Sequence, residues 1–180
     1  MSEVRFLDYS VHANLVEECR KGNRKAQFTI YNQYSKAMFS LAYRMMNNRE
    51  EAEDMLQESF VECFRNLESF RFQATFGAWL KRIVINRCIN ELRRRKTDFT
   101  SFDTLPVDLP DEAPEEIYDT ARIFRAIELL PDGYRIIFTL HLLEGYDHNE
   151  IAQILGISES TSKSQYSRAK VKLRNLLLKK

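Results

Sequence analysis

An acidic stretch that contains several prolines interrupts the helical pattern of this 180-residue chain at residues 98–116. Proline lacks a backbone N–H and disfavours the helical conformation of the residue before it. A continuous helix therefore cannot cross this stretch. The sequence predicts two domains, at residues 1–96 and 117–180, joined by an acidic flexible linker at residues 97–116.

Outside the linker, apolar residues recur at steps of three and four, which is the spacing of one helix face. The pattern is clearest in residues 25–46, where the apolar face includes Phe28 and Ile30, and in residues 50–67 and 76–95. Only 5 Gly and 4 Pro occur in the chain. These features predict an all-α fold, with an N-terminal helical bundle and a C-terminal helical domain.

The net charge of +1 hides strongly charged blocks. Residues 81–96 and 158–180 are rich in Lys and Arg, whereas residues 97–121 carry acids and neither Lys nor Arg. Blocks of this kind indicate surfaces for different partners. The acidic linker is either a solvated spacer or a mimic of nucleic acid that lies in a basic groove of a partner.

Several classes of function lack support in the sequence. The three cysteines are scattered, and the histidines show no ligand spacing beside them, so we expect neither a metal site nor a disulfide. No nucleophile–base pair or phosphate-binding loop is evident, so we expect no enzyme activity, no cofactor and no small-molecule substrate. Without a signal peptide or a long apolar run, we expect a cytoplasmic protein.

The C-terminal domain carries the pattern of a helix-turn-helix. Asp147 and Glu150 have the spacing of a capping box, Gly156 suits a left-handed helix end, and Ser158 can cap the next helix, at residues 159–178. The alternative is two packed helices with a solvated basic face.

The second of these helices has two distinct faces. Its inward stripe is predicted to consist of Ser162, Tyr166, Ala169 and Leu173. Ser162 departs from the usual pattern, which has Val or Ile there. Short hydroxyls and long cations on one face suit the major groove of DNA. That face carries Lys163, Ser164, Ser167 and Arg168.

Three features follow one another in the N-terminal domain. Residues 49–67 form a helix with an acidic outer side, which is either a protein-docking face or merely solvated. A loop with Phe70, Arg71, Phe72 and Phe76 follows. Aromatic rings beside cations can stack on unpaired bases. We expect Phe76 to be mainly core and leave Phe70 and Phe72 open between the two roles.

A basic helix completes the series, with Arg82, Asn86 and Arg87 as candidates to contact DNA. This order of acidic helix, aromatic loop, basic helix, acidic linker and helix-turn-helix resembles the extracytoplasmic-function (ECF) sigma factors of the bacterial primary-sigma superfamily. Residues 52–60 resemble the polymerase-binding motif of that family, and residues 70–80 resemble its promoter-melting segment.

The resemblance implies a transcription initiation factor that binds RNA polymerase core and promoter DNA. Asp54, Gln57 and Glu58 would dock on the clamp helices of the largest polymerase subunit. The −10 promoter element would be recognised and opened by Phe70, Arg71, Phe72, Phe76, Arg82, Asn86 and Arg87. The −35 element would be recognised by Lys163, Ser164, Ser167 and Arg168. The family also implies an anti-sigma factor as a regulatory partner.

Two departures from the family affect these expectations. Phe72 and Ala74 stand where the family often has Gly and Ser, which affects the shape of the loop. Lys163 and Gln165 in the second helix suggest an unusual −35 sequence. The competing hypothesis is a helix-turn-helix regulator that binds operator DNA as a dimer.

Overall fold

The computed structural model describes residues 13–95 and 119–178, and these residues form helices and short connections without strands. The chain divides into two compact units, Met1–Asn90 and Glu91–Lys180. The boundary between the units falls at Asn90 and Glu91, and the predicted linker, residues 97–116, lies outside the described residues. The predicted all-α fold is confirmed.

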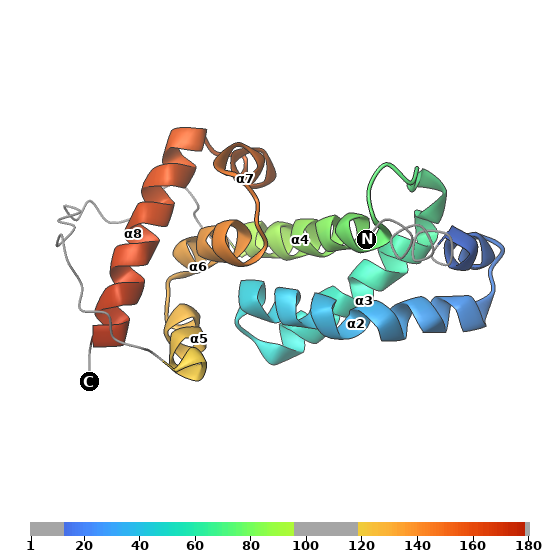
Figure 1. The fold of residues 1–180 in the computed structure, drawn as a ribbon, viewed down its shortest axis with the longest axis horizontal. Coiled ribbons are helices and arrows are strands. Elements are labelled where there is room, and N and C mark those ends of the chain that lie inside the picture. Colours follow the sequence, from blue (N-terminus) through green and yellow to red (C-terminus); the bar gives the residue numbers. More distant parts are fainter. Residues whose placement is uncertain (1–12, 96–118, 179–180) are drawn as a thin grey trace, which may run out of the picture. The chain divides into compact units, whose positions relative to one another are not determined.

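Within the described residues, the first unit begins with a helix at residues 13–20. Its further elements, labelled in Figure 1, are α2 (Arg24–Met46), α3 (Arg49–Arg65), the 3-10 turn η1 (Leu67–Ser69) and α4 (Phe76–Arg94), whose last turn lies beyond Asn90. The elements of the second unit are α5 (Thr120–Glu128), α6 (Asp132–Phe138), the π-helical segment η2 (Thr139–Leu143), α7 (His148–Leu155) and α8 (Glu159–Leu178).

Side chains at the helix ends explain where α2 and α3 begin and end. The side chain of Asn23 accepts the backbone N–H groups of Lys25 and Ala26, and that of Asn48 accepts the N–H of Glu51. Between the helices Asn47 adopts a left-handed conformation, with φ 54°. Asparagine tolerates that conformation better than most residues. The short connection lets α2 and α3 pack against each other.

The core of the first unit is apolar and almost completely enclosed. Ile30, Leu41 and Met45 of α2 are at most 1% exposed, and Leu80 and Ile85 of α4 are equally buried. Phe28, which we expected on the same face as Ile30, is 66% exposed. Two residues along a helix turn the side chain by about 200°, so Phe28 and Ile30 lie on opposite sides.

The second unit has its own core, built mainly from α5, α6 and α8. Its buried members are Ala126, Ile127, Leu130, Tyr134, Phe138, Ala169, Leu173 and Leu177. Leu142 and Leu143 of η2 are exposed, because the π-helical turn changes the phase of the side chains after Phe138. In the part of the chain that the structure describes, no helix has the length and apolar character needed to cross a bilayer.

Candidate nucleic-acid interface

The helix-turn-helix begins with α7, whose two ends are built as its sequence predicts. The side chain of Asp147 accepts the N–H of Glu150 at 2.8 Å, and the carboxylate of Glu150 accepts the N–H of Asp147 at 2.8 Å. This reciprocal pair is a complete capping box. The helix ends at Gly156, whose φ of 68° is the left-handed conformation that glycine adopts without a steric penalty.

The next helix, α8, is capped by Ser158, whose hydroxyl oxygen accepts the N–H of Thr161 at 3.0 Å. Ser162 and Ala169 are fully buried and Leu173 is nearly so, which confirms three positions of the inward stripe. The fourth, Tyr166, is only partly buried. The two capped helices therefore form the predicted motif, with the N-terminal part of α8 available to DNA.

Ser162 has a partner that the sequence did not reveal. Its hydroxyl oxygen lies 2.9 Å from Nδ1 of His148, the first residue of α7. The imidazole of His148 stacks on that of His141 with 4.2 Å between ring centroids and 18° between planes. Tyr166 lies edge-on to His141 at 4.5 Å. We refer to His141, His148, Ser162 and Tyr166 as the histidine cluster.

The outer face of α8 carries the candidates for base and phosphate contacts. Lys163 and Ser164 are exposed, whereas Ser167 and Arg168 are partly exposed. Lys163 forms an ion pair with Glu159 at 2.6 Å one turn earlier. Gln165, which suggested an unusual −35 sequence, does not lie on this face, because it is only 2% exposed. Its Oε1 atom is buried and has no hydrogen-bond partner among the described residues.

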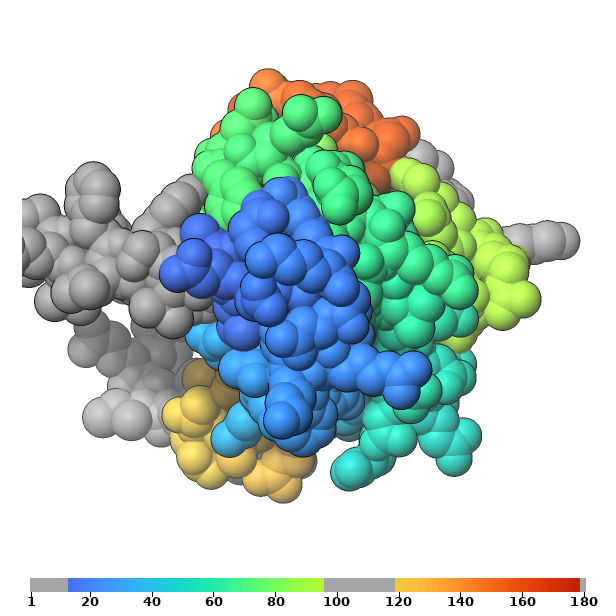
Figure 2. Space-filling model, turned by 90° about the vertical axis from the view of Figure 1, so that its right-hand side faces the viewer, coloured from blue at the N-terminus to red at the C-terminus, as the bar shows by residue number. Residues whose placement is uncertain are grey.

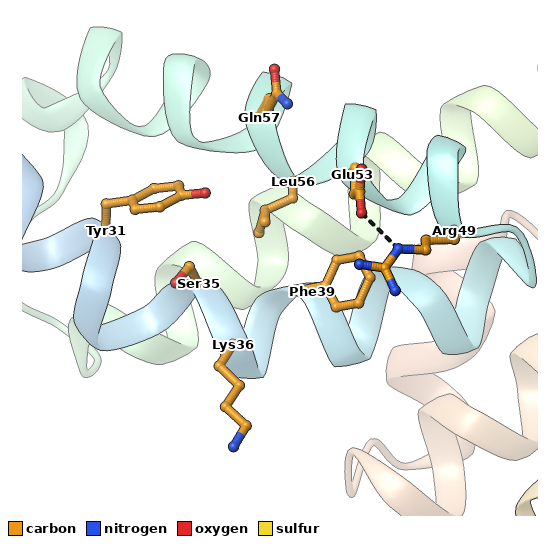
Figure 3. A pocket seen from close by; sticks show the side chains of 8 residues that line it. All are labelled: Tyr31, Ser35, Lys36, Phe39, Arg49, Glu53, Leu56 and Gln57. Atoms are coloured by element: carbon orange, nitrogen blue, oxygen red, sulfur yellow. Dashed lines mark hydrogen bonds and ion pairs between the residues drawn. The ribbon is translucent and has the colours of Figure 1, made fainter.

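In the first unit, the acidic helix α3 presents Asp54, Gln57 and Glu58 to solvent. Their spacing of three and four places them along one side of the helix. Beside them an open groove of about 360 Å³ runs between α2 and α3. Figure 3 shows its lining, with the ion pair of Arg49 and Glu53, 2.9 Å apart, at one end.

The lining of this groove mixes aromatic and aliphatic side chains with polar and charged ones, among them Ser35 and Lys36 of α2. The ring of Phe39 lies 6.0 Å from the guanidinium carbon of Arg49, and Leu56 and Tyr31 line the remaining length (Figure 3). Gln57 lies at its edge. Aromatic rings and an arginine side by side are typical of a surface that contacts another protein.

The basic helix α4 presents Arg82 and Asn86 to solvent, but Arg87 is already engaged. Its guanidinium forms an ion pair with Glu58 at 3.2 Å and a short ion pair with Glu62, both on α3. The structure thus joins a predicted DNA contact to a predicted polymerase contact. Because Arg87 is 39% exposed, each pair stabilises the fold by at most about 1 kcal/mol.

The loop between α3 and α4 is organised by an aromatic cluster. Phe70 and Phe76 are each 4% exposed, and both pack against Trp79 with centroid distances of 5.2 and 5.7 Å. Phe70 is therefore core in this conformation, as we expected for Phe76. The buried rings of Phe70 and Phe76 support the loop from the core, while Arg71 is exposed and Phe72 is partly exposed.

Phe72 adopts a left-handed backbone conformation with φ 56°. A bulky side chain makes this conformation unfavourable by roughly 1–2 kcal/mol. Glycine has no such penalty, which explains why glycine suits this position in the resembled family. The ring packs on Phe70 with 4.7 Å between centroids, so surrounding contacts hold Phe72 in place.

Comparison with known proteins agrees with this arrangement. Residues 30–97 match sigma-70 region 2, and residues 120–173 match sigma-70 region 4. The ECF RNA polymerase sigma factor SigW of Bacillus subtilis is 31% identical over 90% of this chain and 94% of its own length. The chain belongs to the ECF sigma factors. It directs RNA polymerase to the −35 and −10 elements of promoters and promotes their opening.

Further similarities place this sigma factor in the same family. The ECF RNA polymerase sigma-E factor of Salmonella typhimurium is 30% identical over 89% of this chain and 91% of its own length. The solved sigma factor RpoE of Bartonella quintana shares the fold with a TM-score of 0.57 and 22% identity, covering 84% of this chain and 97% of that one.

Proposed function

We propose that this sigma factor binds polymerase core through Asp54, Gln57 and Glu58 of α3. Their exposure along one side of the helix, next to the groove between α2 and α3, supports this assignment. An exposed carboxylate can pair with a basic side chain of polymerase, and the amide of Gln57 can donate and accept hydrogen bonds. The polymerase-binding domain comprises residues 1–96, and a second domain comprises residues 117–180.

The −10 element is contacted by the loop after η1 and by the exposed side of α4. Arg71 and Phe72 provide a cation and a partly exposed ring for unpaired bases, and Phe70 and Phe76 support the loop from the core. Arg82 and Asn86 contact the same element from α4. Arg87 contributes there after exchanging its carboxylate partners for a phosphate.

The −35 element is recognised by the outer face of α8 in the major groove. Lys163 and Ser164 lie near the capped N-terminus of the helix, and Ser167 and Arg168 lie one turn later. In a helix-turn-helix the N-terminal part of the second helix contacts the base edges. The complete capping box and the buried Ser162 and Ala169 hold α8 in the geometry that this contact requires.

The sigma factor works in the cytoplasm, where polymerase and the chromosome are located, and performs no chemical step. Catalysis belongs to polymerase, so the chain takes no cofactor and no small-molecule substrate. An anti-sigma factor regulates it. The RpoE structure contains the anti-sigma factor NepR, and another solved structure with this fold is CnrH in complex with the cytosolic domain of CnrY.

The polymerase contact is tested by replacing Asp54 and Gln57 with alanine together. We expect core polymerase to bind the variant at least about tenfold more weakly in a fluorescence titration, because both contacts are lost from one interface. Its circular dichroism should be unchanged, since both side chains are exposed. Glu50→Ala removes an exposed acid from the same helix and should bind core normally. Equal core affinity of the double variant and the wild type would refute the docking role.

A further inference from the structure

Arg20, at the end of the helix of residues 13–20, reaches across the first unit to the loop before α4. Its Nε and Nη2 atoms donate to the backbone carbonyl of Leu67 at 3.2 and 3.1 Å. Nη2 also donates to the carbonyl of Phe70 at 2.6 Å. Figure 2 shows the blue N-terminal segment beside the green segment that leads into α4.

The remaining parts of the guanidinium are also engaged. Nη1 lies 2.5 Å from the carboxylate of Glu17, one turn earlier on the same helix. The guanidinium carbon lies over the ring of Phe72, 5.5 Å from the ring centroid. The side chain of Arg20 is only 18% exposed. Arg20 therefore contacts Leu67 and Phe70 through their backbone and Phe72 through its ring.

Only arginine can make this set of contacts. Its planar group offers several N–H donors in a fixed fork and a flat face that stacks on aromatic rings. Lysine carries the same charge on one compact ammonium group. That group could not bind both carbonyls and contact the ring at the same time. The contacts to Leu67 and Phe70 span 47 and 50 residues, so they fix the loop to a distant element of the chain.

We propose that Arg20 is the positioning residue of the promoter-melting loop, holding the backbone from Leu67 to Phe72 in the shape that captures unpaired −10 bases. The inference rests on the proposed function of that loop. Arg20 acts through the loop and does not touch DNA. By covering the Phe72 ring it also offsets the strain of a phenylalanine in the left-handed conformation.

The test compares Arg20→Ala and Arg20→Lys with wild type in complete holoenzyme. The template is a promoter recovered by transcribing genomic fragments with the wild-type holoenzyme. Opening is measured by the permanganate reactivity of thymines in the −10 element, and core affinity is measured by titration. We expect both variants to bind core polymerase with wild-type affinity and to open the promoter about tenfold less than wild type.

Lys21→Ala is the matched control. It removes a neighbouring cation whose ion pair with Glu18 is on the surface, so it should behave as wild type. Full opening by Arg20→Lys would overturn the proposal, because it would show that charge alone suffices. Equal opening by Arg20→Ala would overturn it as well. A parallel loss of core affinity in both variants would also overturn it, since it would indicate a general folding role.

A second comparison uses Phe72→Gly, which removes both the strain and the ring. We expect Arg20→Ala to reduce opening less in the Phe72→Gly background than in the wild-type background. Phe72→Gly already removes the contact between Arg20 and the ring and the strain that this contact offsets. Additive effects would overturn the link between Arg20 and Phe72. If a holoenzyme with Arg71→Ala opened the promoter as fully as wild type, that result would instead refute the proposed function of the loop, because Arg71 is the exposed cation of the loop.

Discussion

At the scale of single residues, Ser162 and His148 replace an aliphatic contact in the helix-turn-helix by a polar one. Ser162 is fully buried, and its hydroxyl would lose hydrogen bonding on folding if His148 were absent. His148 in turn is faced by Asp147 on its own segment, by His141 and by Glu159, Lys163 and Tyr166 of α8. The contact between α7 and α8 therefore includes an imidazole.

This contact makes the second domain sensitive to pH. Burial lowers the pKa of His148, and the neighbouring His141 and Lys163 lower the pKa further. The unfolded chain therefore binds more protons than the folded chain as the pH falls below about 6.5, so the free energy of unfolding decreases over that window.

We expect a smaller loss of stability in the double variant His148→Leu, Ser162→Val, which replaces the polar pair by apolar groups. The free energy of unfolding, from urea denaturation at about pH 7.5 and about pH 5.5, should fall less in the variant than in wild type. An equal fall in both proteins would show that His148 does not control this dependence.

The three cysteines act as small apolar side chains. Burial raises the pKa of Cys19 to about 11 and the pKa values of Cys63 and Cys88 to about 12. Neutral thiols are poor nucleophiles and poor metal ligands. Their place in the first domain is explained by packing.

At the scale of elements, local hydrogen bonds determine where the helices begin and end. The capping box of α7 satisfies two backbone N–H groups that the helix itself leaves without partners. Because α7 supports α8, a weakened start of α7 should destabilise the helix-turn-helix as a whole.

Asp147→Ala removes the side chain that caps α7. We expect the free energy of unfolding of the second domain to fall by about 1 kcal/mol, measured by urea denaturation. Asn149→Ala is the control, because Asn149 is an exposed residue in the same turn and should change stability by less than about 0.5 kcal/mol. Equal effects of the two substitutions would argue against the cap.

The π-helical segment η2 is an element that periodicity did not predict. An unbroken α-helical period continued from α6 would bury Leu142 and Leu143, but they are 56% and 37% exposed. The wider turn accompanies the placement of His141 against His148. A local change of helix type depends on contacts with other elements, so a regular period in the sequence does not reveal it.

At the scale of the whole molecule, the net charge of +1 is the sum of surfaces for different partners. The exposed cations of α4 and α8 are the proposed DNA contacts, and the exposed acids of α3 are the proposed polymerase contacts. Promoter binding by the holoenzyme should therefore weaken steeply with salt, since each phosphate contact releases counterions.

Substitutions on α8 should separate two kinds of contact. Lys170→Ala removes an exposed cation further along α8. It should weaken all promoters alike and lower the slope of log affinity against log salt by about one, as for a lost phosphate contact. Arg168→Ala should weaken the native −35 element by about 1–3 kcal/mol more than elements altered at one base pair. Arg125→Ala, on α5, is the control. If Arg168→Ala weakened native and altered elements equally, Arg168 would not contact a base.

Features that depend on neighbouring residues could be predicted from the sequence. The helices, the capping box at Asp147, the turn at Gly156 and the exposed acids around Asp54 all follow from short-range hydrogen bonds and from a period of about 3.6 residues. The family resemblance was carried by the same local motifs, and the comparisons confirmed it.

Only the tertiary structure decided which polar and aromatic residues are enclosed. It buried Gln165 and Phe70, paired His148 with Ser162, engaged Arg87 with Glu58 and brought Arg20 to the loop. Each of these outcomes depends on residues that are distant in the chain and become neighbours only when helices pack. A local pattern specifies the face of a helix, whereas the partner of that face is set by the packing of the domain.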